Sequence, residues 1–210
     1  MRTKKEITVI LRTLEKLFPE AKCPLHYRKP WQLIVAVILS AQCTDKKVNE
    51  VTPALFAKYP TLELLSNAKL RDVEKLIFQT GFYHAKAKHI VSMARTLLRN
   101  HHGKVPQTMA ELTQLPGVGR KTANVVQGEL YGTAEGIAVD AHVIRLARLL
   151  GLTGSSNPIQ IERDLMQQIP ASDWVTFPHR IMSYGRAYCT ARAHDHLACP
   201  LRKLYRPTSI

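Results

Sequence analysis

The sequence is short of cysteine, of acidic residues and of long apolar runs. Its four cysteines (Cys23, Cys43, Cys189 and Cys199) are too few and too scattered for the disulfide framework of a small secreted domain. The longest apolar run covers residues 33–39, well below the ~20 residues that span a bilayer. The N-terminus also lacks the apolar core of a signal peptide. We therefore expect a cytoplasmic protein with no membrane partner.

Positive charge is in excess. The chain of 210 residues has 30 Lys and Arg against 16 Asp and Glu, which gives a formal net charge of +14 and a pI near 9.9. Such an excess favours a polyanionic partner through counterion release, without implying that a base sequence is read. An anionic membrane surface is the rival partner, but the sequence has no basic amphipathic helix flanked by aromatic anchors.

Apolar residues recur at helical spacing through most of the chain, beginning with residues 7–18. The segment Trp31–Leu39 is apolar on all sides and follows Pro30, which suits the first turn of a helix, so we expect a central buried helix there. Pro53 is expected to begin a new turn. No other strand-like run could pair with Trp31–Leu39, and the sequence therefore predicts an all-α fold of about ten helices with short connections.

The segment Leu112–Asn124 carries the most informative motif. A short helix opens with a capping box at residues 108–111 and must end before Pro116. The next residues form a Pro-Gly-Val-Gly turn, in which Gly117 and Gly119 permit tight geometry, and a second helical run follows at once. This pattern predicts a helix-hairpin-helix, whose backbone N–H groups and helix N-terminus suit a DNA phosphate.

Lys121 lies in the first turn of the second helix, beside Arg120 and the positive end of the helix dipole. Both disfavour a protonated ammonium, and an amine must be deprotonated to act as a nucleophile. For the hairpin alone, a lysine that only holds a phosphate is an equal alternative. Asp140 favours the catalytic interpretation. It is expected to cap the next helix, and an ionised cap can also stabilise a cationic sugar or relay a proton.

Together these motifs resemble those of the endonuclease III family of DNA glycosylases and abasic-site lyases. The resemblance rests on Leu-Pro-Gly-Val-Gly-Arg-Lys-Thr-Ala-Asn at 115–124 and Ala-Val-Asp-Ala-His at 138–142, and it extends to 39–45, 81–87 and 185–189. It implies a bifunctional enzyme of base excision repair that removes oxidised pyrimidines and cuts 3′ to abasic sites by Schiff-base β-elimination. The implied partner is double-stranded DNA with damaged bases or abasic sites, bound by a nucleoid-associated monomer.

The resemblance also implies two helical domains that flank a cleft, in the helix-hairpin-helix DNA glycosylase architecture. A six-helix domain with the hairpin would cover residues 23–135. A discontinuous second domain would combine residues 1–22 with residues 136–210. Lys121 would then lie on one lip of the cleft and Asp140 on the other, as the two catalytic residues.

The expected DNA contacts follow from the hairpin and from the same resemblance. Gln42 would fill the space of an extruded nucleotide, and Phe82 would act as an apolar wedge. An ordinary helix-end glutamine and a core phenylalanine are the alternatives. His142 would orient Asp140 or contact phosphate, unless it is a solvated helix histidine. The other expected contacts are Gly117, Val118, Gly119, Arg120, Thr122 and Arg192, and further candidates for phosphate contacts are Lys86, Lys88, Arg145 and Arg148.

One departure concerns the iron–sulfur cluster that family members hold near the C-terminus with four cysteines. The corresponding positions here are Cys189, His196, Cys199 and Tyr205, so two thiolates are replaced, and tyrosine is an unsuitable substitute. We therefore expect no metal at these positions and no cofactor, apart from an alkali-metal ion that the hairpin carbonyls could hold. Zinc bound by Cys189, His196 and Cys199 with His194 is the alternative.

Two rival functions are considered. A monofunctional adenine glycosylase of the same superfamily generally lacks the lysine and carries a further C-terminal domain, whereas Lys121 is present and the sequence ends at Ile210. A non-catalytic hairpin module that docks on DNA would need neither Asp140 nor a pocket for a base.

Overall fold

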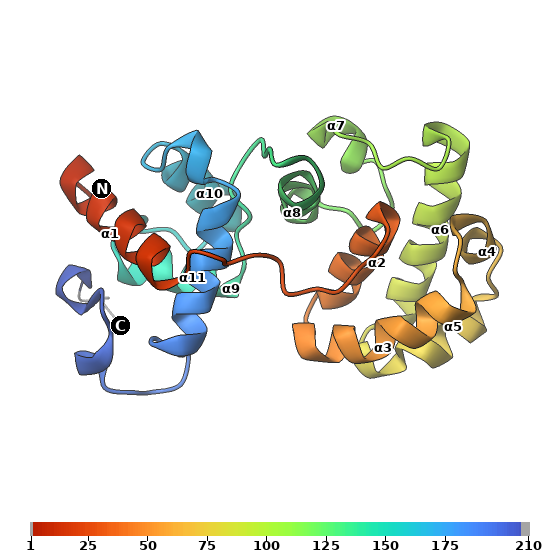
Figure 1. Cartoon of the computed structure of the whole chain (residues 1–210), viewed down its shortest axis with the longest axis horizontal. Helices are drawn as coiled ribbons and strands as arrows, with labels where there is room; N and C mark the ends of the chain where they lie inside the picture. The colour runs from red at the N-terminus through yellow and green to blue at the C-terminus, as the bar shows by residue number, and fades with distance from the viewer. Residues whose placement is uncertain (1, 207–210) are drawn as a thin grey trace. The chain divides into compact units, whose positions relative to one another are not determined.

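The computed structural model describes residues 2–206. These residues form eleven α-helices and four short 3₁₀-helices, and no strand occurs among them. The predicted all-α fold is therefore confirmed (Figure 1). Internal contacts divide the chain into two compact units. One unit is continuous, from Pro24 to Tyr131, and the other combines the chain up to Cys23 with the chain from Gly132 onward.

The continuous unit is built around a buried helix. Every residue from Trp31 to Leu39 in this helix is buried, and the helix packs against three others, α3, α6 and α8. Replacing a fully buried residue such as Ile34 with Ala would cost about 2–5 kcal/mol. The helices of this unit are α2 (Pro30–Ser40), α3 (Asp45–Lys58), α4 (Leu62–Ser66), α5 (Leu70–Ile77), η1 (Phe78–Thr80), α6 (Tyr83–His101), α7 (Met109–Leu112) and α8 (Arg120–Tyr131).

Helix α3 differs from the prediction. Pro53 lies inside the helix instead of beginning a new turn. The proline is exposed, whereas Val48, Val51 and Leu55 form a continuous buried face on either side of it. Packing of that face outweighs the loss of one backbone hydrogen bond, which is the main reason that proline disfavours helix interiors.

The discontinuous unit packs the N-terminal helix against later helices. Its core includes Ile10, Leu14, Leu146 and Ile181, and α1 contacts α11, which in turn contacts α9. Arg2 fastens the N-terminus by donating to the Leu150 carbonyl oxygen (2.7 Å). Its helices are α1 (Lys4–Leu17), α9 (Ala141–Leu149), α10 (Pro158–Met166), η2 (Ala171–Asp173), α11 (Thr176–Ala187), η3 (His196–Ala198) and η4 (Arg202–Leu204).

Membrane-spanning segments were expected to be absent. Among residues 2–206, no helix combines the length and the apolar character that crossing a bilayer requires.

Candidate active site and metal centre

Helices α7 and α8 enclose the predicted hairpin. Thr108 caps α7 by accepting a hydrogen bond from the Glu111 backbone N–H (3.2 Å). The turn is closed by a bond from the Val118 N–H to the Leu115 carbonyl oxygen (3.0 Å). The Val118 side chain is buried. Val118 therefore shapes the turn from inside, and its neighbours provide the exposed surface.

The two hairpin glycines have different surroundings. Gly117 has φ = 81°, and a Cβ there would lie 2.8 Å from the Cβ of His89. Only glycine fits this position without a shift in α6. A Cβ at Gly119 would meet no other atom within 4 Å. The space beside the N-terminus of α8 is therefore open, which suits the approach of a phosphate to the first-turn N–H groups.

Lys121 is exposed in the first turn of α8, directly after this turn. Arg120 beside it is also exposed, and Thr122 is half-buried. An anion held at the helix N-terminus would thus be within one helical turn of the Lys121 amine. The first turn of α8 therefore combines an exposed amine with open space beside the helix N-terminus.

Asp140 belongs to the discontinuous unit, where it caps α9. Its Oδ1 atom accepts a hydrogen bond from the Val143 N–H (2.8 Å), as the sequence predicted. His142, in the first turn of α9, packs against α11, since a Cβ at Gly185 would lie 2.8 Å from the His142 Nδ1 atom. The cap fixes the orientation of the Asp140 carboxylate at the start of the helix.

Gln42 and Phe82 lie on two loops and share an unusual backbone conformation. Gln42 has φ = 52° and follows α2, and Phe82 has φ = 49° and precedes α6. Both side chains are exposed, Phe82 to 67%. Phe82 is therefore not a core residue. A left-handed conformation at a non-glycine residue costs about 1–3 kcal/mol and is concentrated at functional sites.

Lys86 joins the two loops that carry these residues. Its Nζ atom donates to the carbonyl oxygens of Leu39 and Thr80, each at 2.8 Å. The side chain is 4% exposed, and burial lowers the pKa of the ammonium group. The prediction that Lys86 contacts phosphate is wrong, because its charge is used inside the protein. Lys86 instead fixes the backbone just before Gln42 and just before Phe82.

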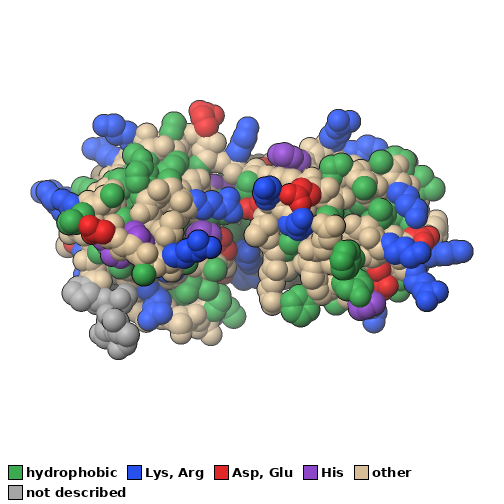
Figure 2. Space-filling view, turned by 90° about the horizontal axis from the view of Figure 1, so that it is seen from below, with side chains coloured by type: hydrophobic (Ala, Val, Ile, Leu, Met, Phe, Trp, Pro, Cys, Tyr) green, Lys and Arg blue, Asp and Glu red, His purple; other side chains and the backbone are tan. Residues whose placement is uncertain are grey.

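A basic hollow lies between α9 and residues 190–196. Its volume is about 580 Å³, and Arg145, Arg148 and Arg192 line it. Arg145 donates to the Cys189 carbonyl oxygen (2.6 Å), while Arg148 and Arg192 are exposed. Lys and Arg side chains are spread over the face in Figure 2, with few acidic side chains among them. The hollow is therefore a positively charged surface in the same unit as Asp140.

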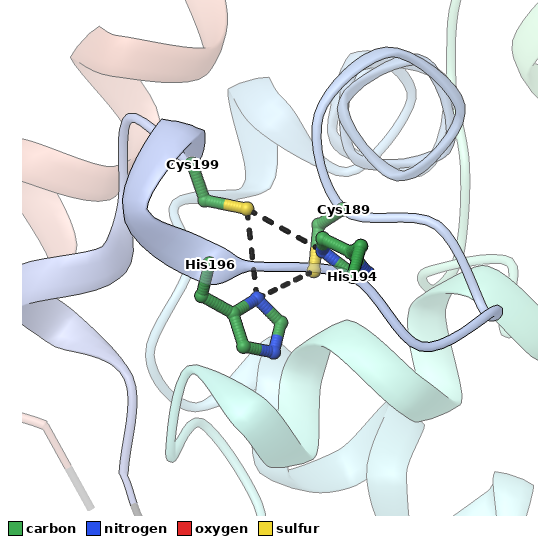
Figure 3. A group of neighbouring side chains, drawn as sticks. All are labelled: Cys189, His194, His196 and Cys199. Carbon is green, nitrogen blue, oxygen red and sulfur yellow. Dashed lines mark hydrogen bonds between the residues drawn. The ribbon is translucent and has the colours of Figure 1, made fainter.

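Four side chains converge after α11. The ligand atoms of Cys189, His194, His196 and Cys199 all lie within 4.8 Å of one another (Figure 3). The expectation that this segment holds no metal or cofactor is therefore wrong. The four residues are consistent with ligation of an iron–sulfur cluster, the group expected at this place in the resembled family, and iron–sulfur ligation by histidine together with cysteine occurs in Rieske centres.

The set of donors also differs from the positions that family spacing indicated. The Tyr205 hydroxyl lies 2.7 Å from the hydroxyl of Tyr184 and also interacts with the side chains of Cys189 and Cys199, so Tyr205 borders the group. His194 takes the fourth place. The sequence signal for this set is the compact spacing Cys-x4-His-x-His-x2-Cys at residues 189–199, and the same four residues made up the zinc alternative.

Known proteins match the chain over most of its length. The family model described as HhH-GPD superfamily base excision DNA repair protein matches residues 35–171. The chain is 51% identical over 189 residues to endonuclease III of Synechocystis, covering 90% of this chain and 86% of that protein. It is 40% identical over 203 residues to endonuclease III of Bacillus subtilis, covering 96% and 92%.

Two solved structures of endonuclease III have the same fold. One is a non-covalent complex with DNA, with a TM-score of 0.92 and 41% identity over 98% of this chain and 96% of that chain. The other is a trapped covalent intermediate with DNA, with a TM-score of 0.92 and 41% identity over 98% and 97%. The chain therefore belongs to the endonuclease III family of the helix-hairpin-helix superfamily, and it is a bifunctional DNA glycosylase and AP lyase of base excision repair.

Proposed function

We propose that Lys121 is the nucleophile of this enzyme and that Asp140 is its electrostatic partner. The observation that carries the proposal is an exposed amine in the first turn of α8, directly behind a turn shaped to receive a phosphate. A relative with 41% identity has been trapped as a covalent intermediate with DNA, which supports an amine that bonds to the sugar. The pairing of Lys121 with Asp140 is part of the proposal.

The proposed reaction has four steps. The neutral Lys121 amine attacks C1′ of the damaged nucleotide, and the bond from C1′ to the base breaks with the electron pair leaving on the base. Asp140 stabilises the positive charge that develops on the sugar. The new ammonium passes a proton to the ring oxygen O4′, and the C1′–O4′ bond breaks. Opening of the ring leaves an iminium (a protonated Schiff base) between Lys121 and C1′, which acidifies the C2′–H. Removal of that proton expels the 3′ phosphate and cuts the strand, and water then releases the lysine.

The DNA would be held by backbone contacts and entered by two loops. The hairpin residues Gly117, Gly119, Arg120 and Thr122, shaped by Val118, would grip phosphate, and Arg192 and His142 would contact it from the other unit. A target base must leave the stack to be reached. Gln42 would fill the vacated space and Phe82 would wedge the neighbouring step, since both are exposed on loops held in strained conformations.

The finer identity of the substrate is part of the same proposal. It is double-stranded DNA that carries an oxidised pyrimidine or an abasic site, bound by a monomer in the nucleoid of the cytoplasm. The DNA complexes of the endonuclease III relatives and the net charge of +14 support a DNA substrate.

Borohydride trapping on a duplex with one abasic site tests the proposal. Reduction of the Schiff base should give a covalent protein–DNA adduct with the wild type and none with Lys121→Gln. Asp140→Asn should slow adduct formation at unchanged folding. Lys75→Gln, which changes an exposed lysine in α5, is the matched control. An adduct that persists in Lys121→Gln would disprove the role of this lysine, and a wild type that gives no adduct at any salt concentration would favour a docking module.

A further inference from the structure

The four converging side chains after α11 have the spacing of ligands to one ion. The Cys199 Sγ atom lies 3.6 Å from the Nε2 atom of His194 and 3.6 Å from the Nδ1 atom of His196. The Cys189 Sγ atom lies 3.8 Å from the same Nδ1 atom. Tetrahedral zinc, with Zn–S of about 2.3 Å and Zn–N of about 2.0–2.1 Å, would hold sulfur and nitrogen about 3.5–3.6 Å apart. The observed distances are close to that geometry.

The distances also distinguish a site for a single metal ion from a site for an iron–sulfur cluster. In a two-iron centre with two histidines, the two cysteines bind one iron and the two histidines bind the other, so sulfur and nitrogen ligands are separated by both irons. Here each sulfur is 3.6–3.8 Å from a histidine nitrogen, although the two cysteine side chains also interact with each other. In a four-iron cluster each ligand binds its own iron around a large core, whereas here all four atoms lie within 4.8 Å of one another.

The histidine tautomer gives an independent indication. The Nδ1 atom of His194 lies 2.8 Å from the carbonyl oxygen of Arg192. A carbonyl oxygen can only accept a hydrogen bond, so Nδ1 must carry the proton and Nε2 must present its lone pair to Cys199. A backbone carbonyl that fixes the tautomer in this way is the usual outer partner of a metal-binding histidine.

An arginine lies beside Cys189. The Arg145 guanidinium donates to the Cys189 carbonyl oxygen and lies 3.6 Å from its sulfur. Both cysteines are at most 1% exposed, so a charged sulfur here needs a cation in contact with it.

We propose that Cys189, His194, His196 and Cys199 bind a single zinc ion in tetrahedral geometry. Four protein ligands leave no open position, which makes the ion structural. It would fasten residues 189–199 to the core of the discontinuous unit, in which Cys189, Cys199 and Leu201 are buried. Arg192 lies between the first two ligands, so the ion would also position that arginine in the basic hollow.

Elemental analysis and an absorption spectrum of the full chain test this proposal. The protein is purified without chelators from cells supplied with both iron and zinc. We expect about one zinc per chain and no absorption band near 400 nm. Replacing zinc with Co²⁺ should give the visible bands of a tetrahedral site with thiolate ligands. Iron with sulfide and a band near 400 nm would overturn the proposal in favour of an iron–sulfur cluster. Purified protein without stoichiometric metal would also overturn it, and the four side chains would then be joined by hydrogen bonds alone.

Variants identify the ligands. His194→Ala and Cys199→Ser should lose most of the bound zinc, whereas Cys43→Ser, at a cysteine of the other unit, should keep it. Tyr205→Phe should also keep it, and loss of the metal in this variant would restore Tyr205 as a ligand. If His194→Ala does not fold, removal of zinc from the wild type with a chromogenic chelator provides an independent test. The folded structure of residues 189–199 should be lost together with the zinc. Release without loss of folded structure would contradict a structural ion.

Discussion

Single residues in the hairpin have separable roles in folding and in DNA binding. Gly117 is needed by the chain itself, because its φ is positive and His89 occupies the space beside it. Gly119 is not crowded by the chain, so its lack of a side chain has another explanation. Close approach of a phosphate to the start of α8 provides one.

Alanine at Gly117 should therefore affect mainly stability, and alanine at Gly119 should affect mainly DNA binding. Gly117→Ala should lower the free energy of unfolding by about 1–3 kcal/mol, through strain and overpacking. Gly119→Ala should change it by less than about 0.5 kcal/mol but should weaken binding to abasic-site DNA several-fold. Urea unfolding and fluorescence anisotropy measure the two quantities. If Gly119→Ala binds DNA with wild-type affinity, the hairpin does not contact phosphate at this position.

Some residues were predictable because their roles are local. The caps at Thr108 and Asp140 follow from the preference of short polar side chains for the free N–H groups of a helix start, and the structure contains both. The engagement of Lys86 was not predictable. It depends on the carbonyl oxygen of Leu39, which is 47 residues away along the chain, and periodicity carries no information about such a pair.

Among the helices, burial of apolar side chains determines which segments are helical. The uninterrupted apolar segment Trp31–Leu39 indicated a central helix, and α2 is one. Pro53 misled the prediction because tertiary packing of α3 outweighed a local preference. The set of Cys189, His194, His196 and Cys199 was an alternative in the sequence, and the fold after α11 brings its four ligand atoms within 4.8 Å of one another.

Lys86→Met tests whether this buried lysine fixes the ends of α2 and η1. Methionine fills similar space but leaves two carbonyl groups without their donor, so the free energy of unfolding should fall by about 1–3 kcal/mol. The neighbouring exposed residue provides the control, Lys88→Met. Binding of abasic-site DNA should also weaken, because the loops of Gln42 and Phe82 lose their common support. Equal stability of both variants would contradict this role.

The pH dependence of this difference has a defined sign. Burial lowers the pKa of Lys86 below its ordinary value of 10.5. Between the lowered pKa of the folded state and 10.5, the unfolded chain binds more protons, so the stability contributed by Lys86 rises with pH. The gap in unfolding free energy between wild type and Lys86→Met should therefore widen toward pH 10.5. Urea titrations of both proteins at several alkaline pH values measure the gap.

For the whole molecule, composition indicated the partner before any motif did. A net charge of +14 favours DNA through counterion release, but it does not say which cations touch phosphate. That assignment needs the fold, which gathers Arg148 and Arg192 around the basic hollow and uses Lys86 internally. The arrangement of Lys121 and Asp140 about a common nucleotide stays a prediction.

Salt dependence distinguishes specific phosphate contacts from net charge. The logarithm of the binding constant should fall linearly with the logarithm of salt concentration, and each phosphate contact contributes about 0.9 to the slope. Arg192→Gln should therefore reduce the slope by about one unit. Arg71→Gln removes the same charge from an exposed position in α5 and should leave the slope nearly unchanged. Anisotropy titrations between about 50 and 200 mM salt measure both. Equal slopes for the two variants would mean that the hollow attracts DNA only through overall charge, and Arg192 would then lose its place among the contacts.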